Sequence, residues 1–352
     1  MAHPQQPLSA AAAGALLGGY VLTAALGTVF TSASRSAGAH GGGGYAYVVV
    51  SATLASEALK FCACAAVLAA RLWAAPTPEA AEGMRAHWIE RLRESRLYAI
   101  PAATYLADNN LSFAVLLWLR PSETALLANV SVLVTALVYR AIMKRALSQQ
   151  KWSALVQLTL GLMVSRIGPS AGSGAASLGS LNLGHLLLLC QIALGAVANV
   201  YSEKLLKDWR SEELALQNAL LYLYGAALNA AALWPVAALQ GRAADPFGGW
   251  NVYTYGVVAA NATCGLCVSV VLKRLSTMVK VLASGTIMIV TVALSAAVFG
   301  REPHLAFYLA AALVFNAIVS YNLPSAGGEK GRGGDDATRG EELLPLEEAT
   351  RA

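Results

Sequence analysis

Charged and polar side chains recur inside otherwise apolar stretches of the sequence, and these are the residues that can bind a ligand. Glu57 and Lys60, in SEALK (56–60), lie three residues apart and so share one face of a helix. A charge at the centre of a membrane costs at least ~2.5 kcal/mol unless it is paired or faces water. Two interpretations follow: the pair only joins helices, or it lines a polar cavity that holds an anion.

A second polar cluster lies in TYLADNNL (104–111), where Asp108, Asn109 and Asn110 interrupt an apolar run. Tyr105 and Asn109 stand four residues apart and so share a helix face. An amide presents both a donor and an acceptor, as the edge of a nucleobase does. The cluster therefore indicates either helix-to-helix hydrogen bonding or recognition of a base.

Two further stretches repeat this pattern later in the chain. In LQNALLYLYG (216–225), Asn218 and Tyr222 again stand four residues apart and place an amide beside an aromatic ring. In NVYSEKLLKDW (199–209), Glu203 and Lys204 mark either the aqueous boundary of a helix or part of a site. The first pair therefore gives this helix a polar face.

Lysines flank a short polar turn in GLCVSVVLKRLSTMVKVLASG (265–285). Lys273 and Lys280 either extend to the membrane interface, or Lys280 reaches into a cavity and meets a phosphate. Lysine suits phosphate because its ammonium is a compact point charge.

Motifs of covalent chemistry are absent from the sequence. It contains no Walker loop, no HExxH and no nucleophile elbow, and the five cysteines lie in apolar runs. Cys264-x-x-Cys267 has no second ligand pair nearby, so we interpret it as packing. We expect no catalytic residue, no metal, no cofactor and no nucleic-acid partner.

The composition places these residues in a membrane. Of the 352 residues, 57% are hydrophobic and 13% are charged, whereas soluble domains are about 25% charged. A spanning helix needs roughly 20 mostly apolar residues. We predict ten spans, at residues 9–30, 45–73, 97–119, 121–143, 149–167, 181–206, 214–240, 250–273, 277–299 and 303–323.

The basic residues are distributed unequally between the two sides that these spans define. Lys and Arg gather after every second span and in the tail, whereas the other loops hold Arg35, Arg120, Arg166, Arg242 and Arg301. Because cytoplasmic loops carry the excess of basic residues, both termini are predicted to face the cytosol.

Ten spans also divide into two halves of five. Residues 139–157 and 297–313 resemble each other, each with a helix end, a basic residue, a polar turn and an aromatic residue. Halves with an odd number of helices lie inverted in the membrane and commonly frame a central substrate site. We therefore predict an all-α membrane protein: a first half at 1–167, a Gly/Ser-rich loop at 168–180, a second half at 181–323 and a disordered cytosolic tail at 324–352.

From about residue 15 to 322 the chain resembles the nucleotide-sugar transporters, in the CMP-sialic acid and UDP-galactose branch of the drug/metabolite transporter superfamily. Its plant and algal CMP-sialic acid transporter-like members are the most similar in pattern. The resemblance is carried by SEALK, YLADNNLSFAVL, RPSETALLANVSVLVTAL, KRALSQQKWSAL, VYSEKLLK, QNALLYLYGAALN and GLCVSVVLKRLSTMVKVLASG.

The resemblance implies a multi-pass Golgi antiporter with ten helices and cytosolic termini. It would exchange a cytosolic nucleotide-sugar for a luminal nucleoside monophosphate. By the same resemblance, Tyr105, Asn109, Asn218 and Tyr222 hold the nucleotide. Lys60 and Lys280 meet phosphate or sugar, with Glu57 nearby, and Ser269 and Ser284 are further cavity residues.

The chain departs from the family pattern in the fourth predicted span. The family usually has Tyr–Gln and then Lys where this chain has Thr124, Ala125 and Ser131. The carboxylate of Asp108, where an amide is commoner, also adds negative charge near an anionic ligand. These departures favour an alternative, a non-transporting membrane scaffold of the same fold that associates with transporters or glycosyltransferases. The identity of the nucleotide and sugar, and whether the protein forms a homo-oligomer, stay open.

Overall fold

The computed structural model describes residues 8–37, 45–115, 118–166, 182–209, 212–241, 245–300 and 303–323. Within these ranges the regular structure consists of α-helices and two short 3₁₀ segments. The predicted loop at 168–180 and the predicted tail at 324–352 lie outside the described residues. The chain is therefore an all-α protein over the part that the structure describes, as predicted.

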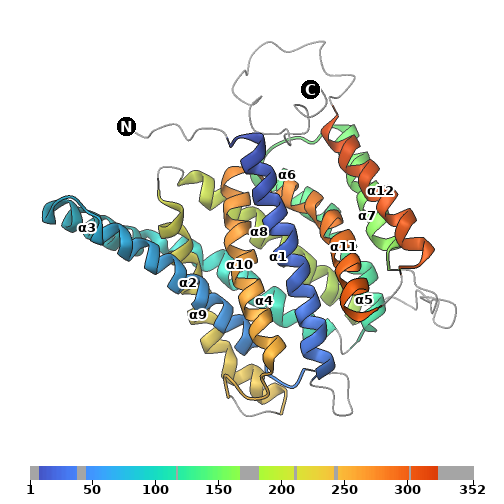
Figure 1. Ribbon diagram of the computed structural model, residues 1–352, viewed down its shortest axis with the longest axis horizontal. Coiled ribbons are helices and arrows are strands. Elements are labelled where there is room, and N and C mark those ends of the chain that lie inside the picture. The colour runs from blue at the N-terminus through green and yellow to red at the C-terminus, as the bar shows by residue number, and fades with distance from the viewer. Residues whose placement is uncertain are drawn as a thin grey trace, which may run out of the picture.

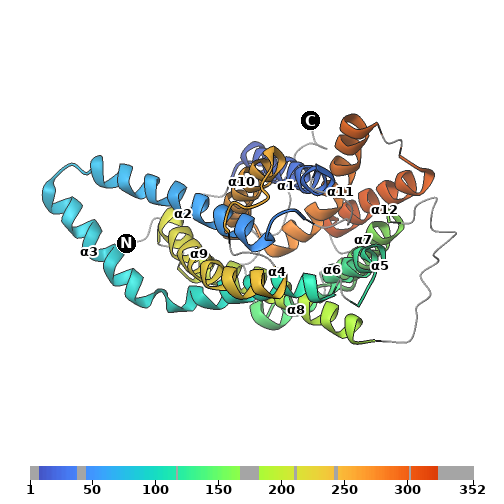
Figure 2. The same ribbon diagram turned by 90° about the horizontal axis from the view of Figure 1, so that it is seen from below.

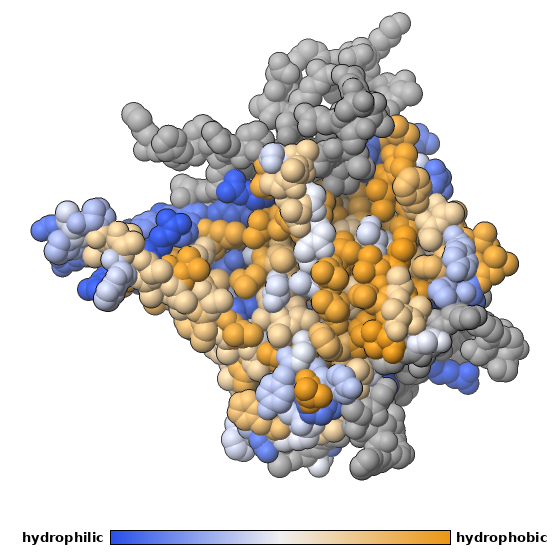
Figure 3. Space-filling model, in the orientation of Figure 1, coloured by the Kyte–Doolittle hydropathy of each residue, from blue (hydrophilic) through white to orange (hydrophobic). Residues whose placement is uncertain are grey.

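Eight helical segments in the described ranges are long and apolar enough to cross a membrane. They are α1 (Ala10–Ala37), α2 (Val49–Trp73), the α5–α6 segment (Pro121–Leu127 and Ser131–Met143), α8 (Leu183–Asp208), α9 (Leu214–Leu239), α10 (Val252–Arg274), α11 (Thr277–Phe299) and α12 (Leu305–Asn322). The multi-pass character is confirmed, and the surface in Figure 3 is largely hydrophobic over this helix bundle.

Two predicted spans correspond to shorter helices. Helix α4 (Ala99–Val115) has 17 residues and α7 (Gln149–Val164) has 16. At 1.5 Å per residue each is about 25 Å long, whereas the hydrocarbon core is about 30 Å thick. The number of ten spans therefore stays a prediction.

The predicted span at 121–143 is interrupted at its centre. Helix α5 ends at Leu127, a 3₁₀ turn covers Ala128–Val130, and α6 begins at Ser131. The Asn129 Nδ2 donates to the backbone oxygens of Ala125 and Leu126, both at 3.1 Å. Short 3₁₀ segments within a helix often mark functional sites, and side chains commonly satisfy the backbone groups there.

Helix packing brings distant parts of the sequence together. Helix α2 packs against α9, α7 against α12, α1 against α10 and α11, and α8 against α4 and α6. In Figure 1, α1 lies between α10 and α11 near the centre of the bundle. Helices α1, α2, α4, α6 and α7 of the first half therefore each contact at least one helix from the second half.

The turns gather at two opposite ends of the bundle. At one end Arg71 pairs with Glu213 at 3.3 Å and the Lys207 Nζ donates to the Leu275 oxygen at 2.6 Å. At the other end the Trp250 Nε1 donates to the Ser51 Oγ at 3.0 Å. Helix α1 begins and α12 ends at the first end, uppermost in Figure 1. This grouping agrees with the alternation of loops that the basic residues predict.

Residues 74–96, which lie between the predicted spans at 45–73 and 97–119, contain a helix of their own. Helix α3 (Pro78–Glu94) follows a short turn after α2, and the two helices project from the bundle as a V that is open toward it (Figures 1 and 2). The Thr77 hydroxyl caps it by accepting from the Ala80 nitrogen at 3.2 Å, and Pro78 occupies the first turn. Proline is favoured at the start of a helix, because the first backbone N–H groups have no acceptor within the helix and its φ angle suits the helix.

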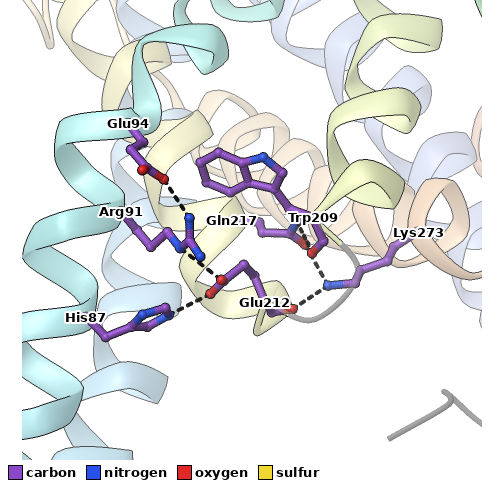
Figure 4. A network of polar contacts seen from close by, with 7 residues as sticks. All are labelled: His87, Arg91, Glu94, Trp209, Glu212, Gln217 and Lys273. Atoms are coloured by element: carbon purple, nitrogen blue, oxygen red, sulfur yellow. Dashed lines mark hydrogen bonds and ion pairs between the residues drawn. The ribbon is translucent and has the colours of Figure 1, made fainter. Parts of the chain in front are cut away.

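A polar network anchors α3 to the α8–α9 turn (Figure 4). The Glu212 carboxylate is 2.8 Å from the His87 Nε2 and 2.9 Å from the Arg91 Nε. The Glu212 backbone oxygen accepts from the Lys273 Nζ at 2.7 Å, and Lys273 also donates to the Gln217 Oε1 at 2.6 Å. Lys273 is therefore a buried structural residue that joins α10 to this network.

The Glu212→Gln variant tests this anchor. Two ionic contacts to α3 are weakened, while the main-chain bond to Lys273 is kept. We expect amide hydrogen exchange in residues 78–94 to accelerate about 5- to 30-fold, equivalent to ~1–2 kcal/mol of local stability. Hydrogen–deuterium exchange mass spectrometry measures this. Glu94→Gln, which removes only a contact within α3, is the matched control, and equal acceleration in both variants would contradict the anchor.

Candidate functional site

Two cavities meet inside the bundle, and Lys280 lines both. The lysine chamber has a volume of about 360 Å³ and is lined by Glu57, Lys60, Tyr105, Asn109, Tyr222, Ser269 and Lys280, among others. The aspartate chamber has a volume of about 400 Å³ and is lined by Asp108, Thr124, Ser131, Gln191, Asn199, Lys280 and Ser284, among others. Both volumes lie in the range of small-molecule sites.

The first charged pair of the sequence forms one wall of the lysine chamber. The Lys60 Nζ is 2.6 Å from the Glu57 Oε1 and 4.4 Å from the centroid of the Tyr222 ring. A Cβ at Gly225 would lie 2.9 Å from the Glu57 Oε2, and one at Gly265 would lie 2.9 Å from the Lys60 Cδ. The two glycines on α9 and α10 therefore give α2 room for its charges.

Asn218 lies behind the wall of the lysine chamber rather than in it. Its Nδ2 donates to the Ser269 Oγ at 2.7 Å, and Ser269 donates to the Leu266 oxygen at 2.8 Å. The Tyr222 hydroxyl donates to the Gly265 oxygen at 3.2 Å. Asn218 therefore orients Ser269, which lines the chamber, and joins α9 to α10.

Asn199, which the sequence analysis does not select, lies between the chambers. Its Oδ1 accepts from the Tyr105 hydroxyl at 3.0 Å and from the Lys280 Nζ, while its Nδ2 donates to the Gly195 oxygen at 2.7 Å. The amide thereby fixes a tyrosine of one chamber and the lysine shared by both. Its signal in the sequence is an amide one helical turn before Glu203, within the stretch 199–209 that the pattern of polar residues already marks.

The aspartate chamber is built around Asp108. A Cβ at Gly195 would lie 3.0 Å from the Asp108 Oδ2, so the glycine leaves space for the carboxylate. The Gln191 side chain hydrogen-bonds Asp108. The chamber also includes Ser131, at the start of α6, and Ser284, whose Oγ donates to the Val281 oxygen at 2.6 Å.

The structure therefore places the predicted site residues, with the exception of Asn218, in the walls of two adjoining chambers. Lys60 and Lys280 line the same chamber, as the sequence analysis requires for an anion site. Among the described residues, no group of three His, Cys, Asp or Glu side chains could hold a metal ion. Lysines, aromatic rings and amides in a partly apolar cavity are suited to binding an anionic, hydrogen-bonding organic molecule.

Comparisons with known proteins agree with this geometry. The family model described as nucleotide-sugar transporter matches residues 20–322. CMP-sialic acid transporter 1 of Oryza sativa subsp. japonica is 30% identical over 238 residues, which cover 66% of this chain and 74% of that protein. CMP-sialic acid transporter 1 of Arabidopsis thaliana is 31% identical over 238 residues, covering 65% and 69%.

A solved crystal structure supports the fold. It superposes with a TM-score of 0.60 at 16% sequence identity and covers 89% of this chain and 96% of its own. At this identity the likeness concerns the arrangement of helices alone.

Removal of the Asn199 amide tests its place between the chambers. In Asn199→Ala, Tyr105 and Lys280 lose a shared acceptor, so we expect a loss of roughly 1–3 kcal/mol in stability. Thermal unfolding of the detergent-solubilised protein measures it. Tyr105→Phe combined with Asn199→Ala is expected to cost less than the sum of the single variants. Asn322→Ala, which removes a bond within α12, is the control, and additive effects at 105 and 199 would contradict the shared acceptor.

Proposed function

Because this chain belongs to the nucleotide-sugar transporter family, a family of transporters and not of enzymes, we propose that it exchanges a cytosolic nucleotide-sugar for a luminal nucleoside monophosphate. The relatives carry the name CMP-sialic acid transporter. For this chain the candidates are a CMP-sialic acid-like substrate and a UDP-sugar such as UDP-galactose.

The observation that carries the proposal is the shared position of Lys280. Its ammonium lines both chambers and donates to Asn199, which is a neutral group. Lys60, in contrast, already has the carboxylate of Glu57 at 2.6 Å. A phosphate beside Lys280 would add a direct ionic contact that the Asn199 amide does not provide, and phosphate is common to a nucleotide-sugar and a monophosphate.

The remaining lysine-chamber residues fit a nucleoside. The rings of Tyr105 and Tyr222 provide apolar faces, and Asn109 and Ser269 provide hydrogen-bonding groups at the same wall. We assign the nucleoside to this chamber, with Tyr105, Asn109 and Tyr222 in contact and Asn218 acting through Ser269.

Obligatory exchange follows from the energetics of the charges. The lysine chamber holds two lysines against one glutamate, and turning this excess charge from one side of an apolar bundle to the other is costly when no anion neutralises it. Either bound anion relieves this cost, so the loaded carrier reorients while the empty one resists. A ligand shifts such an equilibrium only by its differential affinity for the two states.

Helix contacts support two inverted halves that rock around the site. If α1, α2, α4, α5–α6 and α7 correspond to α8, α9, α10, α11 and α12, exchanging the halves converts the α1–α10 contact into the α8–α4 contact. The α1–α11 contact likewise becomes the α8–α6 contact, while α2–α9 and α7–α12 map onto themselves. This supports ten spans in two five-helix repeats.

The proposed location is the Golgi membrane, with both termini cytosolic. The family resemblance and the excess of basic residues on one side support this assignment. The non-transporting scaffold remains the alternative class, since Ser131 lines the aspartate chamber where the family pattern has a lysine. A scaffold has no need to bind nucleotide, so nucleotide-dependent thermal stabilisation separates the two.

Proteoliposomes provide the test. Vesicles preloaded with CMP or UMP are expected to take up radiolabelled CMP-sialic acid or a UDP-sugar, and empty vesicles far less. Lys280→Met should lower uptake at least about 10-fold, because a charge-assisted phosphate contact is worth ~1.5–3 kcal/mol. Lys204→Met, also on a helix but lining neither chamber, is the control. Folded protein that shows neither uptake nor nucleotide-dependent stabilisation would favour the scaffold.

A further inference from the structure

The two chambers differ in their charge. Besides Lys280, which both share, the lysine chamber contains the Glu57–Lys60 pair, whereas the charged lining residue of the aspartate chamber is Asp108. The other polar groups of the aspartate chamber are hydroxyls and amides, at Tyr20, Thr124, Ser131, Thr135, Gln191, Asn199, Thr277 and Ser284. This chamber is therefore rich in neutral hydrogen-bonding groups and contains a carboxylate.

Three buried atoms of its wall lack a hydrogen-bond partner among the described residues. They are the Thr124 Oγ1, the Gln191 Oε1 and the Thr277 Oγ1. A buried polar atom without a partner is unfavourable, so the wall is complementary to a guest with donors. Gln191 is oriented by its hydrogen bond to Asp108, so its unpartnered oxygen and the carboxylate lie close together. Clustered acceptors of this kind fit clustered hydroxyl groups.

The Asp108 carboxylate also disfavours binding of a guest that carries a carboxylate of its own. Gly195 leaves room for Asp108, and the charge of Asp108 interacts with that of Lys280, which lines the same chamber. A like charge brought close in a partly apolar cavity is strongly disfavoured. At the position where the family pattern supplies a lysine, Ser131 offers a hydroxyl and no compensating cation.

We propose that the aspartate chamber holds the sugar and selects a neutral hexose over a sugar that carries a carboxylate. The proposal rests on the proposed function, because Lys280 fixes the phosphate at the junction and the nucleoside occupies the lysine chamber. The sugar then extends into the aspartate chamber, where Asp108, Gln191 and Thr124 accept its hydroxyl hydrogens. Asp108 is thus a specificity-determining residue for an uncharged sugar.

The matched ligands UDP-glucose and UDP-glucuronic acid test the selection, since they share the nucleotide and differ by a hydroxymethyl group against a carboxylate. The readouts are thermal stabilisation of the purified full-length protein and competition for uptake into preloaded proteoliposomes. We expect UDP-glucose to bind about 10-fold or more tightly than UDP-glucuronic acid. CMP-sialic acid, as an acidic sugar on another nucleotide, should also bind more weakly than UDP-glucose.

Variants assign the effect to Asp108. Asp108→Asn should reduce the ratio of the UDP-glucuronic acid Kd to the UDP-glucose Kd about 10-fold. Ser131→Lys should shift this ratio in favour of UDP-glucuronic acid. Glu123→Gln removes a carboxylate that lies outside the chamber, paired with His185 at 3.3 Å, and should leave the preference unchanged. Stabilisation by UMP or CMP reports that each variant is folded.

The outcomes separate this inference from the proposed function. Stabilisation by monophosphates together with equal or tighter binding of acidic sugars, or with no binding of UDP-glucose, overturns the neutral-sugar assignment and leaves the transporter intact. Absence of stabilisation by any nucleotide or nucleotide-sugar overturns the proposed function itself. Because the wild-type comparison decides the sugar preference, the inference does not depend on the variants folding.

Discussion

The compensation of charge within an apolar helix bundle is the constraint on which the structure depends. Lys60 meets it locally, with the Glu57 carboxylate on its own helix and the Tyr222 ring beside it. Lys280 meets it differently, through the neutral amide of Asn199. An ion pair on one helix is nearly self-sufficient, whereas an ammonium held by an amide retains affinity for an anion. The difference between the two lysines is thus the physical basis for the proposed binding site.

Other buried charges serve the framework that positions Lys280. Glu203 is fully buried, pairs with Lys207 at 2.9 Å and accepts from the Thr277 nitrogen at 2.7 Å. It thereby caps the start of α11, one turn before Lys280. Because the first amides of a helix have no internal acceptor, the carboxylate both satisfies one of them and fixes where the helix begins. A structural ion pair therefore fixes the position of a candidate binding lysine.

Glycines determine where polar side chains fit between helices. Gly225 and Gly265 leave room for Glu57 and Lys60, and Gly195 leaves room for Asp108. In a membrane, helices associate through close packing because lipid provides no hydrophobic drive between them. A side chain at any of these glycines would displace a charged group from the cavity wall. Each of these charged residues therefore depends on a glycine of the neighbouring helix.

By itself, the sequence determined the all-α multi-pass class and most helix positions. It also indicated that alternate turns lie at the same end of the bundle, and it identified the two lysines that line one chamber. These depend on local quantities: apolar run length, the spacing of polar residues, and the charge of loops. Only the tertiary structure decided that 78–94 is a helix anchored by Glu212 and that Asn218 lies behind Ser269. It alone also decided that Asn199, Gln191 and Thr124 line the aspartate chamber. Each of these depends on contacts between helices far apart in the chain, and an amide or hydroxyl on an apolar helix looks the same in sequence whether it faces a cavity or a neighbouring helix.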